Sequence, residues 1–193
     1  MTRQDRRDGG EAMKNAPTKR IILVSGPPGS GKTTLARPLA EALGFALLTK
    51  DDIKETLYTA MHGAPGDAAF SRQIGSAAME VLWALGPHCP AVVLEANFRT
   101  KSDYEREKVA GLLAGGARIV ELYCRLPREE ASRRFAERAR EVRHHPAHAL
   151  AEMAPERIAE FEEPFGMGPV IEVDTRAAVD MARLVVQVDE LWG

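Results

Sequence analysis

One motif limits the fold of this chain more than any other, the eight residues Gly26–Thr33 with the spacing G-x-x-x-x-G-K-[ST]. A short apolar, β-branched run at residues 21–24 precedes the motif and predicts a buried strand. Apolar residues at helical spacing follow from Leu35, and Gly44 is suited to end that helix. Because strand, glycine-rich loop and helix occur in this order, the motif predicts a site for a nucleoside triphosphate rather than a simple turn.

The motif also predicts how the triphosphate is bound. Its glycines let successive backbone N–H groups surround the phosphates, and the N-terminus of the following helix adds a favourable dipole. Lys32 is expected to contact the β- and γ-phosphates of ATP, and the Thr33 hydroxyl is expected to bind Mg²⁺. The predicted nucleotide-binding residues are Gly26, Pro27, Pro28, Gly29, Ser30, Gly31, Lys32, Thr33 and Thr34.

Length and charge narrow the class of protein. With 193 residues, the chain suits one α/β domain with a full core and is short for two. The formal net charge is −2, so no overall positive field draws the protein to nucleic acid or membranes. The two cysteines make no disulfide framework, and no apolar run approaches the length of a membrane span. No apolar segment follows the arginines near the N-terminus, so we expect no signal peptide and a cytoplasmic protein.

Strands and helices alternate from Lys19 onward, whereas residues 1–18 are polar and aperiodic and are expected to be a disordered tail. Alternating βα units with apolar strands predict a parallel sheet that is covered on both faces, with ligands at the carboxyl ends of the strands. Further strands are predicted at 45–48, 91–94, 118–123 and 170–173. Further helices are predicted at 51–61, 68–85, 102–114, 127–140, 155–162 and 177–191.

Two adjacent carboxylates, Asp51 and Asp52, follow the second predicted strand, at the edge of the sheet where ligands gather. Asp51 is placed to accept a proton from a hydroxyl that attacks the γ-phosphate. Lys54 lies one helical turn away, where it can help to hold an anionic or hydroxylated substrate. Helix capping is the alternative role for both carboxylates. The sequence favours the functional role for Asp51 and leaves Asp52 open between the two.

An acidic residue, Glu95, closes the third predicted strand. It resembles a Walker B carboxylate, which holds Mg²⁺ or its water shell, and it can instead hold the substrate hydroxyl. An ordinary strand-end carboxylate in solvent is the alternative without a function. Asn97 and Arg99, just beyond this strand, are further candidates for contacts with the substrate.

The helix predicted at 127–140 is rich in arginine. Arg134 and Arg138 are four residues apart and share a face, which suits a pair that clamps phosphates as charge develops during transfer. A solvated helix laced with salt bridges is the alternative for its other arginines. A lid is expected at about 138–150, because the histidine-containing segment there matches no regular zinc spacing.

Together these motifs resemble the small P-loop kinases. The segments G-P-P-G-S-G-K-T-T, K-D-D-I-K, L-E-A-N-F and R-R-F-A-E-R-A-R are similar to those of AAA_33-type ATP-binding proteins. That group is zeta-toxin-like and polynucleotide-kinase-like and includes chloramphenicol phosphotransferases. The resemblance covers residues 19–193. It implies one P-loop kinase domain of the three-layer α/β class, with a five-stranded parallel sheet in the order 2-3-1-4-5 and a small lid.

The resemblance also implies a reaction and its residues. Members of the group transfer the γ-phosphoryl group of ATP to a hydroxyl, which places the catalytic base on Asp51 and the lid arginine pair on Arg134 and Arg138. Two positions depart from polynucleotide kinases. Lys54 replaces an arginine and loses bidentate recognition of phosphate. Glu95 stands where those kinases have an aspartate.

Three functions stay open from the sequence. The first is an ATP-dependent kinase for a small hydroxylated molecule, such as an antibiotic, a nucleoside or a sugar-like acceptor. The second is a polynucleotide 5′-hydroxyl kinase, which needs a basic channel with stacking aromatics, whereas only 6% of residues are aromatic and the net charge is negative. The third is a switch protein that hydrolyses ATP without a phosphate acceptor. We expect a monomer or a homodimer and no membrane partner.

Overall fold

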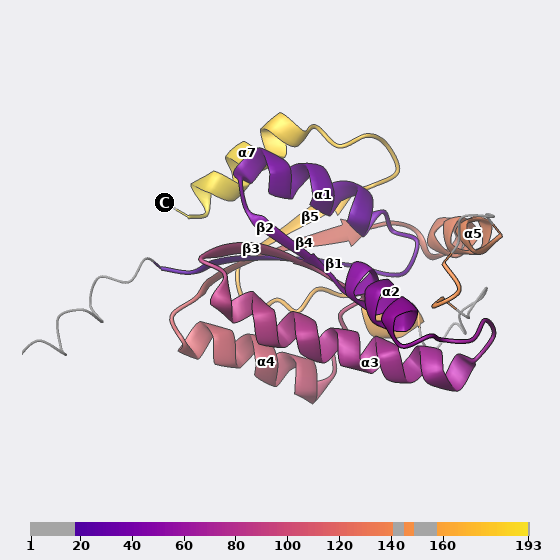
Figure 1. Ribbon diagram of the computed structural model, residues 1–193. Helices are drawn as coiled ribbons and strands as arrows, with labels where there is room; N and C mark the ends of the chain where they lie inside the picture. The colour runs from indigo at the N-terminus through magenta and orange to yellow at the C-terminus, as the bar shows by residue number, and fades with distance from the viewer. Residues whose placement is uncertain (1–17, 141–144, 149–157, 193) are drawn as a thin grey trace, which may run out of the picture.

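Five parallel strands form one sheet at the centre of the protein, with helices on both of its faces (Figure 1). The computed structural model describes residues 18–140, 145–148 and 158–192. The strand order is β2-β3-β1-β4-β5, as the resemblance to small P-loop kinases implies. The strands are β1 Arg20–Ser25, β2 Ala46–Thr49, β3 Ala91–Glu95, β4 Arg118–Arg125 and β5 Val170–Asp174.

The register of the strands brings their carboxyl ends to one edge of the sheet. Thr49 at the end of β2 pairs with Glu95 at the end of β3, and Glu95 pairs with Val24 of β1. The residues that follow β1 and β2 therefore leave the sheet beside Glu95. This is the edge at which the sequence predicts a ligand site.

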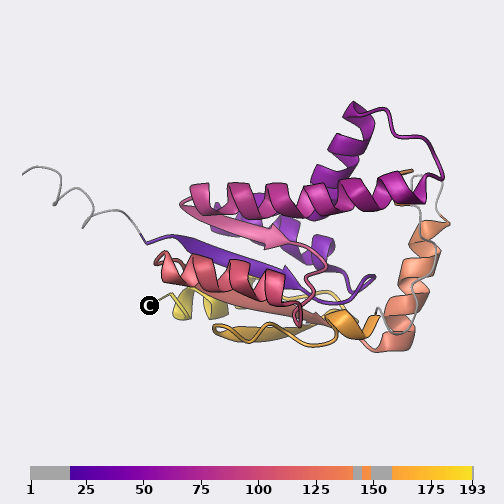
Figure 2. The same cartoon turned by 90° about the horizontal axis from the view of Figure 1, so that it is seen from below.

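The helices divide between the two faces and the ligand edge of the sheet. In Figure 1, α1 and α7 cover one face and α3 and α4 cover the other. Helix α5 stands beyond the carboxyl ends of the strands, as Figure 2 also shows. The helices are α1 Lys32–Leu43, α2 Lys50–Ala60, α3 Ala68–Leu85, α4 Asp103–Ala114, α5 Arg128–Ala139 and α7 Met181–Glu190, with 3₁₀ turns at η1 Gly86–His88 and η2 Ala159–Phe161.

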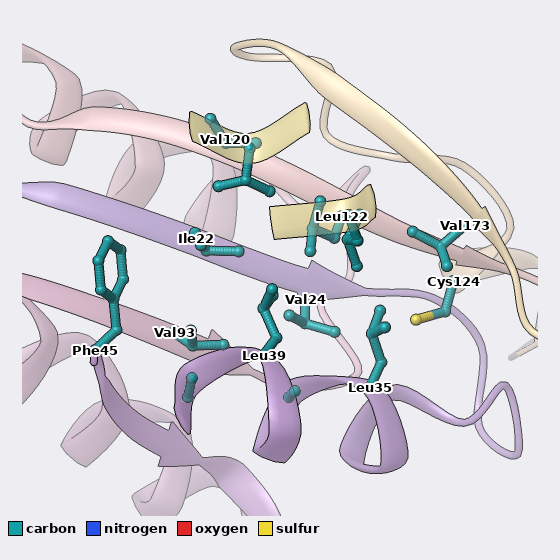
Figure 3. Close-up of a cluster of buried hydrophobic side chains, with 14 residues drawn as sticks. Ile22, Val24, Leu35, Leu39, Phe45, Val93, Val120, Leu122, Cys124 and Val173 are labelled. Carbon is teal, nitrogen blue, oxygen red and sulfur yellow. The ribbon is translucent and has the colours of Figure 1, made fainter. Parts of the chain in front are cut away.

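The core lies on both faces of the sheet because the strands are continuous apolar runs. On one face, Ile22 and Val24 of β1 meet Leu35 and Leu39 of α1 (Figure 3). On the other face, Ile21 and Leu23 belong to a second cluster with residues of α3 and α4. Alternate residues of β1 thus anchor opposite helix layers, which fixes the position of the loop that follows β1.

Two predicted helices differ from the structure. The closing helix begins at Met181 rather than at residue 177, because the Asp180 side chain accepts a hydrogen bond from the Arg183 N–H (3.0 Å) and caps the helix there. The helix predicted at 155–162 is described only from residue 158, where a 3₁₀ turn spans Ala159–Phe161.

Two other predictions fall largely outside the described residues. The predicted tail, residues 1–18, lies outside them except for Thr18, and the lid predicted at about 138–150 is described only at 138–140 and 145–148. Among the helices of the described ranges, none has the length and apolar content that a membrane span requires.

Candidate active site

The phosphate-binding loop connects β1 to α1 through backbone conformations that require glycine. Gly26 and Gly29 have φ values of 133° and 82°, in the region that L-residues rarely adopt. A Cβ on Gly26 would lie 2.6 Å from the Cys124 carbonyl oxygen. A Cβ on Gly29 would lie 2.2 Å from the carbonyl oxygen of Ala131 in α5. The loop therefore packs closely against both β4 and α5.

Lys32, the first residue of α1, is folded back over this loop. Its Nζ donates hydrogen bonds to the carbonyl oxygens of Gly26 (3.0 Å) and Pro27 (2.8 Å), and the residue is only 6% exposed. Burial lowers the pKa of the Lys32 ammonium, and the Glu95 carboxylate acts in the opposite direction. The negative charge of a polyphosphate in the loop would offset the cost of burying this cation.

The Thr33 hydroxyl donates to Glu95 Oε2 at 3.1 Å, which joins the start of α1 to the end of β3. Glu95 is buried, and burial raises the pKa of its carboxyl. A hydroxyl and a carboxylate are the hard oxygen ligands that suit Mg²⁺, which takes few protein ligands and keeps waters and phosphate oxygens. Among the described residues there is no group of three or more His, Cys, Asp or Glu that could hold a metal. The pair fits magnesium held together with nucleotide.

Asp51 lies in the first turn of α2, directly after β2. Thr49 ends the strand and caps the helix, since its hydroxyl accepts a hydrogen bond from the Asp52 N–H (3.0 Å). Asp51 Oδ1 lies 3.2 Å from Lys50 Nζ, and Oδ2 lies 4.0 Å from Nη2 of Arg138. The structure therefore brings together two residues that the sequence assigns to catalysis from 87 positions apart (138 − 51).

The electrostatics of Asp51 favour its anion. Burial alone would raise the pKa of the Asp51 carboxyl, but the neighbouring basic groups, Lys50 foremost, outweigh burial and lower the pKa to about 2. Near neutral pH the group is a carboxylate that accepts hydrogen bonds. It is well suited to orient a hydroxyl and, without nucleotide, is a weak base.

Asp52 does not share this environment. Both of its carboxylate oxygens accept from Nη2 of Arg37 (2.8 and 2.7 Å) in an exposed contact between α2 and α1. Because Thr49 supplies the side-chain cap of α2, Asp52 is a surface ion-pair residue in the structure.

The two predicted clamp arginines diverge. Arg138 faces Asp51, whereas Arg134 donates through Nη1 to the Thr175 carbonyl (3.0 Å) and through Nη2 to the Arg176 carbonyl (3.5 Å). The salt-bridge interpretation describes Arg133 well, since Glu130 and Glu137 both accept from it. Helix α5 thus contacts the phosphate loop, the segment after β5 and Asp51.

The remaining predicted substrate residues have separate settings. Arg99 donates to the buried carboxylate of Glu105 through its backbone N–H (2.9 Å) and its Nε (3.2 Å). Asn97 is half-buried beyond β3. Lys54 Nζ donates to the Ser71 hydroxyl of α3 (3.0 Å) inside the protein.

Residues 145–148, between the ranges that are not described, pack onto α2 and α3. Ala147 is fully buried, and its carbonyl accepts from the Ser71 hydroxyl (2.5 Å). His148 Nε2 lies 2.8 Å from Glu55 Oε1, and burial lowers the pKa of this imidazole. The sequence places histidines in a lid but carries no signal for these partners, which lie 76 and 93 residues away.

A pocket of about 210 Å³ lies at the carboxyl ends of β4 and β5, lined by Arg125, Leu126, Pro127, Asp174 and Arg176. Thr175 connects it to the phosphate loop, because a Cβ on Gly31 would lie 3.7 Å from the Thr175 Cβ. The sequence analysis missed this pocket.

The sheet order, the glycine loop and the Thr33–Glu95 pair together define a P-loop nucleotide-binding protein of the kinase type. The chain belongs to the AAA_33 family, described as an AAA domain, whose family model matches residues 21–164.

Solved structures and a curated relative agree with this class. A candidate kinase from Chloroflexus aurantiacus J-10-fl has a TM-score of 0.78 and 26% identity, covering 90% of this chain and 98% of that one. A gluconokinase from Sinorhizobium meliloti 1021 shares the fold, with a TM-score of 0.51 and 20% identity over 89% of each chain. A probable gluconokinase of Schizosaccharomyces pombe is 49% identical over 39 residues, so the match spans a fifth of either protein.

Proposed function

We propose that the protein transfers the γ-phosphoryl group of ATP to a hydroxyl of a small molecule. The observation that carries the proposal is the contact between Asp51 of α2 and Arg138 of α5 at the edge where Lys32 and Glu95 lie. The charges of Asp51, Glu95 and Arg138 all act on the Lys32 ammonium, so these groups share one site. In this proposal Asp51 is the group that orients the attacking hydroxyl, the role that a positioned base has in phosphoryl transfer.

The nucleotide half of the mechanism follows from the loop. Backbone N–H groups of residues 29–34 hold the phosphates, and Lys32 leaves its two carbonyl partners to contact the β- and γ-phosphates. When bound through Thr33 and Glu95, Mg²⁺ would neutralise charge on the transferring group. The adenine base of ATP would lie in the pocket between Arg125 and Arg176, which adjoins the phosphate loop through Thr175.

The acceptor half depends on Asp51. Its carboxylate accepts the hydrogen bond of the attacking hydroxyl and fixes the direction of attack. The charges of bound ATP raise the pKa of Asp51 from about 2, so its capacity to take the proton grows when nucleotide is present. Arg138 then lies beside the phosphoryl group in transfer, where its charge favours the transition state.

Three observations favour a small molecule over a polynucleotide. The net charge is −2, few residues are aromatic, and residues 145–148 cover α2 and α3 next to Asp51. Two of the similar proteins, the gluconokinase of S. meliloti and the probable gluconokinase of S. pombe, point in the same direction.

The test is a panel of acceptors, comprising antibiotics, nucleosides, sugars, hydroxy acids and RNA 5′-ends, each added to the protein with Mg·ATP. We expect one class of small hydroxyl compound to stimulate ADP release, with a phosphate ester identified by mass spectrometry. A hydrolysis rate that no acceptor changes would instead favour the ATP-hydrolysing switch protein. Phosphorylated RNA ends would favour the polynucleotide kinase.

A further inference from the structure

Lys54 is a buried cation that makes no ion pair within the described part of the chain. The residue is 7% exposed, and its Nζ donates to one neutral group, the Ser71 hydroxyl, at 3.0 Å. Within the described ranges no carboxylate lies within 4.0 Å of it. Burial, with the Lys50 ammonium acting in the same direction, lowers the pKa of Lys54 to about 8, although the charges of Asp51 and Glu55 act in the opposite direction.

The nearest acidic side chains are engaged elsewhere. Asp51 pairs with Lys50 (3.2 Å), and Glu55 pairs with His148 (2.8 Å). The Ser71 hydroxyl accepts from Lys54 and donates its own hydrogen to the Ala147 carbonyl (2.5 Å), so it has no hydrogen left to donate to a ligand. An ammonium has three donors, so Lys54 keeps donors for a ligand beyond Ser71.

Lys54 is also placed to act together with Asp51. The two residues are three apart on α2 and therefore lie on one face of the helix. The aliphatic part of Lys54 lies against α3 at Gly75, where an added Cβ would lie 3.6 Å from Cε of Lys54. The ammonium is thus held between α2 and α3, one helical turn from the carboxylate that would hold the acceptor hydroxyl.

Building on the proposed function, we propose that the acceptor carries an oxyanion, a carboxylate or a phosphate, which binds the Lys54 ammonium while its hydroxyl lies against Asp51. An uncharged analogue would leave Lys54 without a counter-charge and would bind less well. Selectivity for an anionic acceptor follows, since a site built around a buried polar group rejects a ligand that leaves the group unpaired.

The first test compares matched acceptors. D-gluconate is paired with D-glucitol for the carboxylate, and D-glucose 6-phosphate with D-glucose for the phosphate, alongside other hydroxy acids and sugar phosphates with uncharged counterparts. We expect kcat/KM for an anionic member to exceed that of its partner, and Lys54→Met to reduce this preference by roughly 10–10²-fold. Lys108→Met, an exposed lysine of α4, is the matched control and should keep the preference.

The second test needs no turnover and uses the intact wild-type chain. With the phosphate loop saturated by Mg·ADP, the Lys54 ammonium is titrated by NMR with and without acetate or inorganic phosphate. An oxyanion at Lys54 should raise its pKa from about 8 towards the usual lysine value. A shift with acetate indicates a carboxylate site, and a shift with inorganic phosphate indicates a phosphate site.

The outcomes separate this inference from the kinase proposal. If wild type and Lys54→Met are both active and show the same preference between anionic acceptors and their uncharged partners, the protein is a kinase and the anion site is wrong. If neither probe moves the titration of Lys54, the anion site is again wrong, whatever the acceptor panel shows. If both probes move it while no acceptor stimulates ADP release, the anion site stands and the kinase proposal fails.

Discussion

The nucleotide half and the acceptor half of the candidate site are built differently. In the nucleotide half, Lys32 bonds carbonyl groups five and six residues away, within a single strand–loop–helix unit. In the acceptor half, Ser71 meets Ala147 and Glu55 meets His148, pairs that are 76 and 93 residues apart. The contacts of Lys32 are local backbone geometry, joined to β3 by the single pair of Thr33 and Glu95, whereas these contacts of the acceptor half are all tertiary. A fold can therefore keep its phosphate donor while the acceptor changes.

The largest effect is expected from Lys32→Ala, which breaks the nucleotide half. Turnover of ATP should fall by roughly 10²–10³-fold or more, because the contact to the transferring phosphates is lost. Calorimetry should show weaker binding of Mg·ATP. Thermal melting should show a folded protein, since the change removes a buried cation. Retained turnover with unchanged Mg·ATP affinity would mean that the loop is not the nucleotide site.

Asp51→Asn tests the acceptor half by itself. The change keeps the shape but removes the charge, so phosphorylation of the acceptor should fall by roughly 10²–10³-fold. Binding of Mg·ATP should change little. Asp52→Asn is the matched control next in sequence, and only its surface pair with Arg37 is lost. Equal losses in both variants would contradict the separate roles that the structure gives them.

Arg138 and Arg134 of α5 belong to different halves of the site, since Arg138 faces the acceptor half and Arg134 holds the segment beside the pocket proposed for adenine. Arg138→Ala should lower kcat by roughly 10–10²-fold with little change in KM for ATP. Arg134→Ala should mainly raise KM for ATP and spare the binding of tripolyphosphate, which lacks a base. If Arg134→Ala weakens the binding of tripolyphosphate as much as that of ATP, Arg134 contacts the phosphates, as the paired clamp predicted from the sequence requires.

Gly29→Ala should lower the stability of the fold, an effect measured in unfolding rather than in turnover and small beside the losses expected above. A left-handed φ costs a non-glycine residue about 1–3 kcal/mol, and the new Cβ would also clash with the Ala131 carbonyl of α5. Gly116→Ala is the control, because its φ is 80° and no atom lies within 4 Å of the added Cβ. If the unfolding temperature falls equally in the two variants, α5 does not pack closely against the loop.

What the sequence predicts well is what depends on neighbouring residues. The glycine loop, the parallel sheet and Asp51 at a strand end all follow from local pattern and from the rule that ligands meet the carboxyl ends of strands. Even the misplaced start of the last helix had a local signal, because Asp180 precedes apolar residues at helical spacing.

The rest depends on contacts that no local pattern carries. Glu121 stands inside an apolar strand, and only the fold shows that Ser25 and the backbone of Phe165 and Gly166 donate to its carboxylate. Arg134 and Arg138 share a helix face, yet Arg134 bonds the Thr175 carbonyl and Arg138 lies against the Asp51 carboxylate. The burial of Lys54 against Ser71 is likewise visible only once α3 is placed.

The junction of β2 and α2 bears on how such a protein can diversify. Thr49 is the last residue of the strand and Lys50 the first of the helix, so no connecting residue stands between them. Because there is no loop at this junction, insertions and deletions are poorly tolerated there, and the position of the Asp51 carboxylate relative to the sheet is kept. We expect changes of acceptor to arise in α3 and in residues 61–67 between α2 and α3. A mutant library aimed at new acceptors belongs in those segments.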